Sequence, residues 1–428
     1  MNIIHGDCLE ELKKLEDNSI DAVVCDPPYG LSNTKPQQVA DVLKAWVTGD
    51  TVSVPAKRGG FMGKDWDSFV PPPAVWEECM RVLKPGGHMA VFAGARTQDL
   101  MGLSIRLAGF EIRDTLGWIY GSGMPKSHNI SKAIDKAAGA EREVIGDSPY
   151  ASRKPNGSAG VASVGLSATP GAKITAPATP EAKQWDGWGT SLKPAIEPIL
   201  LCRKPLDGTV AGNVLAHGVG GLNIDACRVD MGAEYDPKKI QRQNSDTSGM
   251  RGLGAAGYRS DHEQPTYNPT GRFPANVLLD EHAAKEMDKQ SGVLKSGGGN
   301  KGPRSSSWLT SNSPDVDDVR NPDSGGASRF FPVFKYQAKA PKKERPVIER
   351  EDGSKIQHPT VKPEKLMSWL VELITPPGGV VLDPFAGSGT TLQAALNKGF
   401  TPIGIEQDAD YIKLIEKRLE ATCTTHKN

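Results

Sequence analysis

The sequence predicts an α/β protein with a mostly parallel, doubly wound sheet and a long inserted segment. Two polar motifs support this prediction, because each follows a short apolar run typical of a buried strand and precedes a helical pattern. They are Asp26-Pro27-Pro28-Tyr29, after the run 20–25, and Asp383-Pro384-Phe385-Ala386-Gly387-Ser388-Gly389-Thr390-Thr391, after the run 380–382. Open α/β sheets bind their ligands where strands end in this way.

Strands and helices are predicted to alternate in an N-terminal block. Leu9, Leu12 and Leu15 share one face of a helical pattern, and Pro85-Gly86-Gly87 is expected to stop a second helix. The predicted strands are 3–4, 20–25 and 88–92, with a strand-rich stretch at 110–120, and the predicted helices are 8–15, 74–83 and 97–108.

A second α/β block is predicted near the C-terminus. It comprises a helix at 364–374, a strand at 380–383, a helix at 390–397, a strand at 401–405 and a terminal helix at 408–419. The chain is therefore expected to divide into a catalytic half at 1–138, an inserted recognition region at 139–350 and a cofactor-binding half at 351–428.

The expected insertion differs in composition from both blocks. It is rich in Ala, Ser, Pro and Gly at 152–180, rich in Gly at 249–257 and 296–302, and polar at 305–326. Apolar stretches recur within it, which predicts a folded insertion with flexible connections rather than a disordered linker. These stretches are 196–201, 213–229, 273–279 and 330–336.

The bulk composition excludes several classes of protein. The 428 residues carry 51 Lys and Arg against 51 Asp and Glu, so a diffusely basic, histone-like binder is not expected. Six cysteines form no CxxC pair and eight histidines show no HExxH spacing, so neither a metal site nor a disulfide framework is predicted. No signal sequence or run of about 18 apolar residues is evident, which predicts a reduced, cytoplasmic protein without membrane spans.

The glycine-rich motif indicates a small-molecule site. Gly387 and Gly389 form a tight turn before a helix, where backbone N–H groups approach a ligand closely. The dinucleotide fingerprint needs a glycine where Leu392 stands, and the phosphate-binding P-loop needs a lysine that is absent. Glu406 closes the next strand, in the position of an acid that binds ribose hydroxyls. A nucleoside with a small zwitterionic tail fits these features, which describes S-adenosylmethionine.

Together the two motifs resemble those of the DNA amino-methyltransferases, in the permuted order called the β class. In that order the Asp-Pro-Pro-Tyr motif precedes the recognition region and the Phe-x-Gly-x-Gly motif follows it. The resemblance implies a circularly permuted, Rossmann-like methyltransferase fold that uses S-adenosylmethionine. The segments 120–127 and 192–198 resemble those of phage and prophage members with large insertions, and a bacterial cell or phage-infected host is the implied setting.

The resemblance also implies roles for individual residues. Residues 6–8 resemble an adenine-contacting loop, and 358–363 resemble a segment that helps to bind the methionine end of the cofactor. The implied catalytic residues are Asp26, Pro27, Pro28 and Tyr29. The implied cofactor-binding residues are Asp7, Cys8, Asp26, His358, Thr360, Lys362, Asp383, Phe385, Gly387, Ser388, Gly389, Thr390 and Glu406.

The Asp-Pro-Pro-Tyr motif suits methylation of an exocyclic amino group. The nitrogen lone pair of such a group is delocalised into the base, so a catalyst must localise it. Asp26 and the Pro27 carbonyl each accept one amino proton, and Tyr29 stacks on a base flipped out of the duplex.

Asp26 favours adenine N6 over cytosine N4, where a serine is more usual. An RNA or protein amide methyltransferase would be expected to have Asn at this position, and an inactive DNA-binding protein would be expected to have lost Asp26 or Tyr29.

Double-stranded DNA is the expected partner, with a homodimer as a further possibility. Residues 151–350 carry 27 Lys and Arg against 21 Asp and Glu, a net charge of +6 in a chain whose total is zero. Basic residues alternate with aromatic ones at 329–345, a pattern that suits phosphates and stacked bases, although it also suits a strand with a core face. The predicted DNA-binding residues are Arg329, Lys335, Tyr336, Lys342 and Lys343.

Overall fold

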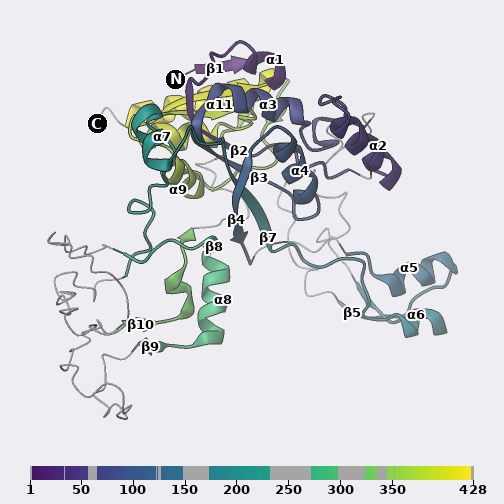
Figure 1. Ribbon diagram of the computed structural model, residues 1–428. Helices are drawn as coiled ribbons and strands as arrows, with labels where there is room; N and C mark the ends of the chain where they lie inside the picture. The colour runs from purple at the N-terminus through teal and green to yellow at the C-terminus, as the bar shows by residue number, and fades with distance from the viewer. Residues whose placement is uncertain are drawn as a thin grey trace, which may run out of the picture. The chain divides into compact units, whose positions relative to one another are not determined.

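A single large sheet organises the main compact unit, Met1–Tyr120 with Ile196–Asn428. The computed structural model describes residues 2–32, 34–55, 65–121, 123, 127–147, 173–231, 271–296, 323–334, 345–350 and 352–425. Within these residues nine strands form the sheet, in the order β1-β15-β14-β2-β3-β7-β4-β8-β11 (Figure 1). Their bounds are β1 Asn2–His5, β2 Ile20–Cys25, β3 Leu83–Phe92, β4 Glu111–Ile119, β7 Ile196–Arg203, β8 Val277–Asp280, β11 Val333–Phe334, β14 Val380–Asp383 and β15 Thr401–Glu406.

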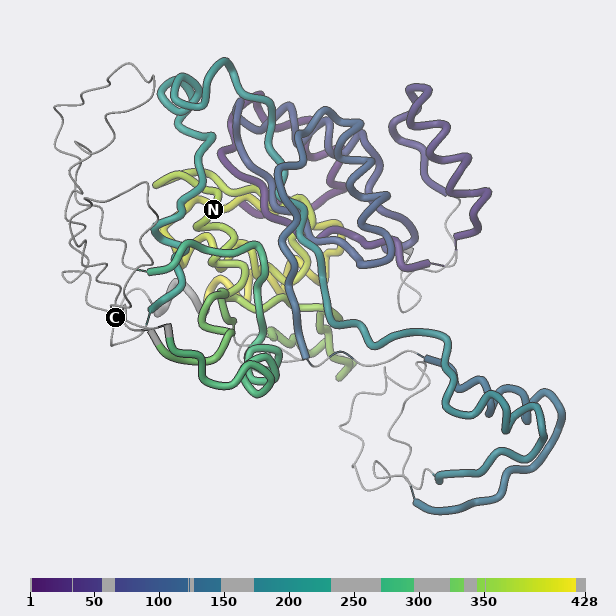
Figure 2. Tube along the Cα trace, turned by 60° about the horizontal axis from the view of Figure 1, so that its bottom comes forward, coloured from purple at the N-terminus to yellow at the C-terminus, as the bar shows by residue number. Residues whose placement is uncertain are grey.

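Most strand pairs are parallel, as the sequence predicted. All four pairs in the row β1-β15-β14-β2-β3 are parallel, so the carboxyl ends of these strands share one edge of the sheet. The exception is β7, which is antiparallel to both β3 and β4. Two strands from the C-terminal block lie between β1 and β2, and Figure 2 shows the purple N-terminal trace beside the yellow C-terminal one.

Helices cover both faces of the sheet, which makes it doubly wound. Successive residues of β2 point to opposite faces. Val23 and Cys25 pack in one core cluster with residues of α1, α2, α3 and α4, while Ala22 and Val24 pack in another with residues of α9 and α10. The helices of this unit are α1 Cys8–Leu12, α2 Pro36–Val47, α3 Pro73–Val82, α4 Gln98–Leu107, α7 Val210–His217, α8 Glu281–Ser291, α9 Glu364–Ile374, α10 Thr390–Asn397 and α11 Ala409–Thr425.

Smaller elements complete this unit. They are the two-stranded pairs β9 Leu294–Ser296 with β10 Asp323–Gly325 and β12 Ile348–Glu349 with β13 Lys355–Ile356, and the 3-10 helices η2 Asp65–Asp67 and η5 Ala327–Phe330. Among the described residues, no helix combines the length and the apolar character that a membrane span requires.

The structure differs from the sequence predictions at several element bounds. Helix α1 ends at Leu12, three residues before the predicted end at Leu15. Helix α3 ends at Val82, and Pro85-Gly86-Gly87 lies inside β3, where Gly86 has φ +78°. Helix α2 was not predicted, although Val42 and Trp46 give it a buried face.

The region expected to be an insertion contributes to the main sheet. Strands β7, β8 and β11 all come from the range 139–350. Burial explains the position of β7, because its residues from Pro198 to Arg203 are all buried between β3 and β4. The predicted glycine-rich stretch at 249–257 lies outside the described residues.

A second compact unit covers Gly121–Ala195. Its described elements are α5 Ile130–Ala137, β5 Val144–Asp147, β6 Lys173–Thr175 and α6 Pro180–Gln184, with β5 antiparallel to β6.

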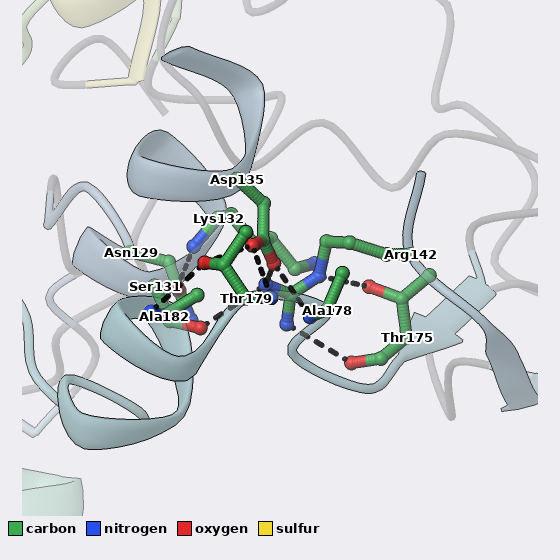
Figure 3. A network of polar contacts seen from close by, with 9 residues as sticks. All are labelled: Asn129, Ser131, Lys132, Asp135, Arg142, Thr175, Ala178, Thr179 and Ala182. Atoms are coloured by element: carbon green, nitrogen blue, oxygen red, sulfur yellow. Dashed lines mark hydrogen bonds and ion pairs between the residues drawn. The ribbon is translucent and has the colours of Figure 1, made fainter. Parts of the chain in front are cut away.

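A buried polar network stabilises this unit (Figure 3). The Asp135 carboxylate accepts hydrogen bonds from Arg142 at 2.5 Å, the Thr179 hydroxyl at 2.8 Å, and the Ala178 and Thr179 amides at 3.0 Å. Burial alone would raise the pKa of Asp135, but these four donors together lower it to about 2. The carboxylate therefore ties α5 to the start of α6 in its ionised form.

Candidate active site

Four acidic residues lie at one edge of the main sheet. Asp7 follows β1, Asp26 follows β2, and Asp383 and Glu406 end β14 and β15. Because these strands are parallel neighbours, their carboxyl ends bring the four loops together, as the two sequence motifs predicted. The negative charges of Asp26 and Glu406 both act on Asp383.

The loop that carries Asp26 and Tyr29 is held by two residues from elsewhere in the chain. The carboxylate of Asp67, 3% exposed, accepts hydrogen bonds from the backbone N–H of Tyr29 at 2.7 Å and of Gly30 at 3.0 Å. The Thr97 hydroxyl donates to the Tyr29 carbonyl at 2.6 Å. This loop is therefore preorganised by contacts to its backbone, which do not involve the side chains of Asp26 and Tyr29.

Four side chains, which we call the lysine cluster, meet beside this loop: Asp26, Tyr29, Glu197 and Lys362. Lys362 Nζ lies 2.9 Å from Asp26 Oδ2, 3.0 Å from Glu197 Oε2 and 3.0 Å from Tyr29 Oη. The Tyr29 hydroxyl donates to Asp26 Oδ1 at 2.7 Å, and its distance to Glu197 Oε2 is 3.4 Å. The Lys362 ammonium also lies 4.8 Å from the centre of the Phe92 ring.

The protonation states of this cluster follow from its charges. Burial alone would lower the pKa of Lys362, but the carboxylates of Asp26 and Glu197 outweigh burial and raise it above its usual range. Burial, followed by the same two carboxylates, raises the pKa of Tyr29. At neutral pH the lysine is thus a cation and the tyrosine is a neutral donor.

The glycine turn is bound directly to Glu406. Glu406 accepts the Gly387 N–H on Oε2 and the Asp408 N–H on Oε1, each at 2.8 Å. The Ala386 N–H donates to the Ile405 carbonyl at 2.9 Å, which holds the turn against the end of β15. Burial is the main cause that raises the pKa of Glu406, and the two amides oppose it.

Two glycines in this turn have backbone conformations that favour glycine. Gly387 has φ +52° and Gly389 has φ +76°. A Cβ at Gly387 would lie 3.0 Å from Nε2 of His358, whose ring packs against Tyr411 with centroids 4.7 Å apart. Burial lowers the pKa of His358. The turn thus leaves room for close approach only because no side chain is present.

Asp383 is a buried acid, 2% exposed, at the end of β14. Burial raises its pKa from 3.8 to about 7, with smaller contributions from the charges of Asp26 and Glu406, while a Thr391 hydrogen bond and the Phe385 N–H lower it. Asp383 therefore titrates near neutral pH in the folded protein.

This shift predicts how stability depends on pH. A carboxyl group with a raised folded-state pKa binds its proton more tightly in the folded protein, so its stabilising effect is complete below about pH 4 and is lost as the pH rises to about 7. The melting temperature without cofactor is therefore expected to fall between about pH 4 and 7, and to fall less in Asp383→Asn, which stays neutral. Thermal melts across this range check the prediction, and equal slopes for both proteins would contradict it.

The remaining residues with expected cofactor roles lie in or beside the same loops. The Asp7 carboxylate caps α1 by accepting from the Leu9 N–H at 3.0 Å and the Glu10 N–H at 3.3 Å. Burial, and next the charge of Asp7, raise the pKa of the Cys8 thiol to about 12.

The other residues expected to contact the cofactor lie in the glycine motif or in the segment 358–362. Phe385 packs against Trp76 with ring centroids 6.1 Å apart, and Ser388 Oγ lies 3.2 Å from Thr390 Oγ1. His358 Nδ1 donates to the Thr360 carbonyl oxygen. Lys362, also expected to bind cofactor, contacts Asp26 of the Asp-Pro-Pro-Tyr motif through its ammonium.

Comparison with known proteins assigns the family. A family model for N6/N4 methyltransferases, described as DNA methylase, matches residues 20–417. The chain belongs to this family. Among the described residues of this chain, no group of three or more His, Cys, Asp or Glu is arranged to hold a metal ion.

Two curated relatives match short parts of the chain. The type II methyltransferase M2.DpnII of Streptococcus pneumoniae is 44% identical over 70 residues, which are 16% of this chain and 26% of that protein. The DNA adenine methyltransferase YhdJ of Escherichia coli strain K12 is 48% identical over 63 residues, 15% of this chain and 21% of that protein. The matched segments thus span about a quarter or less of these relatives.

Solved structures of methylases are similar at a lower level. A modification methylase from Thermus thermophilus, complexed with S-adenosylmethionine, covers 99% of this chain at 16% identity with a TM-score of 0.37; the match covers 96% of that chain. Because a TM-score below 0.5 does not establish a common fold, the family assignment rests on the sequence match.

Most of the residues predicted to bind DNA lie outside the described part of the chain: Lys335, Tyr336, Lys342 and Lys343. Arg329 is described, and its guanidinium donates to the carbonyls of Gly325 and Gly326, both at 2.8 Å. Phe334 is 8% exposed and packs against Trp369, so the core interpretation of the aromatic pattern holds at that position.

Three residues at the site were not predicted from the sequence. Asp67 and Thr97 position the Tyr29 loop, and Glu197 contacts Lys362. A signal for Glu197 was present, because a lone acid between Ile196 and Pro198 opens a strand that is otherwise apolar as far as Cys202.

Proposed function

We propose that this protein transfers a methyl group from S-adenosylmethionine to the exocyclic N6 of adenine in duplex DNA. One observation carries the proposal: the Asp26 carboxylate, beside Tyr29 and Lys362, lies at the same sheet edge as the glycine turn and its acidic partner Glu406. An acceptor for amino protons and a site for a nucleoside therefore lie side by side at that edge of the sheet.

The residues around the glycine turn fit S-adenosylmethionine. Gly387 leaves a space that a side chain would fill, Glu406 presents carboxylate oxygens for ribose hydroxyls, and Asp383 offers a buried acid for the amino group of the methionine end. Asp7, Phe385 and the 358–360 segment would line the same site. The bound cofactor supplies an electrophilic methyl group on its sulfonium.

Asp26 and Pro27 would act on the target amino group. Its lone pair is delocalised into the base, so the nitrogen becomes a nucleophile only when its protons are held and its geometry turns tetrahedral. Asp26 Oδ1 accepts a hydrogen bond from one N–H and takes its proton as the methyl group is transferred, and the Pro27 carbonyl accepts a hydrogen bond from the other N–H. In the structure the Tyr29 hydroxyl donates to Asp26 Oδ1 at 2.7 Å, so we expect the amino group to compete with it for this oxygen.

Base flipping makes the amino group accessible. Extrusion of a paired base costs a few kcal/mol, and stacking on the Tyr29 ring returns about 1–3 kcal/mol. We place target recognition in the 139–350 range, whose positive charge suits the phosphate backbone. The position of β14 and β15 between β1 and β2 supports a permuted order of the methyltransferase motifs.

Expression in a host that lacks DNA methylation tests this function. Sequencing that detects modified bases is expected to reveal N6-methyladenine at one short sequence, and none in cells that express Asp26→Ala. Recovery of N4-methylcytosine would retain the enzyme class and replace the target base. Unmodified DNA in cells that contain folded protein would reject the proposal.

A further inference from the structure

Glu197 provides Lys362 with a second carboxylate partner, although one carboxylate is enough to balance the charge of the ammonium. Asp26 alone provides Lys362 with a counter-ion at 2.9 Å, yet Glu197 adds another at 3.0 Å, so two carboxylates and one ammonium leave a net negative charge in a largely buried cluster. Crowding like charges in this way is unfavourable for stability. The unfavourable pairing of Glu197 with Asp26 beside the Asp-Pro-Pro-Tyr loop makes Glu197 a candidate for a functional role.

The backbone of Glu197 is rigidly placed. Glu197 pairs with Trp118 across β4, and the carbonyl of the following Pro198 accepts the Ala93 N–H at 2.9 Å beyond the end of β3. The side chain is 24% exposed, and Lys362 is 10% exposed. A side chain fixed on the central strands holds its partner more precisely than one on a loop.

We propose that Glu197 is a positioning residue for methyl transfer, which holds Lys362 and receives the Tyr29 hydroxyl when the target amino group takes its place on Asp26. This inference rests on the proposed function. The Tyr29 hydroxyl already lies 3.4 Å from Glu197 Oε2, so a small rotation changes its acceptor from Asp26 to Glu197.

Glu197 also limits how strongly Lys362 engages Asp26. The ammonium divides its hydrogen bonds among Asp26, Glu197 and Tyr29. Without Glu197, the ammonium keeps Asp26 as its sole carboxylate partner within the lysine cluster, and the Tyr29 hydroxyl loses its alternative acceptor. Both changes leave Asp26 less available to the amino group, although neither touches the glycine turn.

Single-turnover transfer of a labelled methyl group tests this role in Glu197→Gln and Glu197→Ala. Gln keeps an acceptor for the Tyr29 hydroxyl but loses the charge, and Ala loses both. The rate is expected to fall by about 10-fold in Glu197→Gln and by roughly 10²-fold in Glu197→Ala, with unchanged S-adenosylmethionine affinity. Unchanged affinity also shows that the variants are folded.

Glu111→Gln provides a matched control. Glu111 of β4 pairs with Arg203 at 2.7 Å, at the opposite end of β7 from Glu197, so its substitution breaks an ion pair between these two strands without touching the lysine cluster. Its transfer rate is expected to equal that of the wild type.

A double-mutant cycle with Lys362→Met separates positioning from a structural role. If Glu197 acts through the lysine, Glu197→Gln should lower the rate much less in the Lys362→Met background than in the wild type. Full wild-type rates in both Glu197 variants, or equal losses in the two backgrounds, would overturn the inference. Absence of transfer by the wild type would instead reject the proposed function, and this inference with it.

Discussion

Asp26→Ala is expected to abolish methyl transfer while leaving cofactor affinity close to that of the wild type. Asp26 is the proposed acceptor for an amino proton, and the loss of one positioned group of this kind costs at least about 3 kcal/mol, or some 10²-fold in rate. The proposed cofactor site depends mainly on Gly387, Asp383 and Glu406, which the substitution leaves in place. Single-turnover kinetics with labelled cofactor, together with calorimetry, measure the two effects separately.

Asp17→Ala is a suitable control for this experiment. Asp17 is an exposed acid paired with Arg81 at 2.5 Å, so its loss removes one negative charge that belongs to neither motif. Its rate is expected to match that of the wild type. Substantial transfer by Asp26→Ala would remove this carboxylate from the mechanism.

Gly387→Val is expected to block cofactor binding. The new side chain would fill the space in front of His358, where a Cβ comes within 3.0 Å of Nε2, and a β-branched residue is strained at φ +52°. We expect affinity for S-adenosylmethionine to fall at least about 100-fold, which corresponds to about 2.8 kcal/mol. Isothermal calorimetry measures this directly.

Gly399→Val controls for backbone strain alone. Gly399 has φ +78°, but no atom of the described residues lies within 4 Å of a Cβ built there. Both variants should therefore lose some thermal stability, and only Gly387→Val should lose cofactor affinity. Equal affinities in the two variants would place the cofactor elsewhere.

The sequence predicted the strands that carry the motifs because their signal is local. Apolar runs such as 20–25 end directly at a charged residue, and β2 has the predicted bounds. The same holds for β14, at Val380–Asp383. The sequence also sufficed to predict that Asp26 and Asp383 lie at one edge of the sheet, since parallel neighbouring strands have their carboxyl ends at the same edge.

The contacts of the lysine cluster could not be predicted from local sequence patterns, because they join residues far apart in the chain. Lys362 Nζ lies 3.0 Å from the hydroxyl of Tyr29, 333 positions earlier, and no spacing rule predicts that contact. Lys362 appeared only as part of a cofactor-binding segment. Glu197 lies in the range predicted to be an insertion and was not expected at the site. The antiparallel pairing of β7 with β3 and β4, which places Glu197 there, is a tertiary feature that no local pattern indicates.

The second compact unit was missed for a different reason. Its described interior includes the buried Asp135 and Arg142 network, which no spacing in the sequence indicates. Helix α5 has apolar residues at helical spacing, Ile130, Ala133, Ile134 and Ala137, but this pattern covers only 8 residues and lies where the catalytic half was expected to end. Helix α5 was therefore not predicted.

Identification of the methylated nucleoside tests the proposed reaction. Purified protein is incubated with duplex DNA that contains many sequences and with S-adenosylmethionine labelled on its methyl group, and the DNA is then digested and separated into nucleosides. We expect the label in N6-methyl-2′-deoxyadenosine, and no label in DNA treated with Asp26→Ala. Label in a methylated cytosine nucleoside, or equal labelling by Asp26→Ala, would refute the proposed transfer to adenine N6 by Asp26.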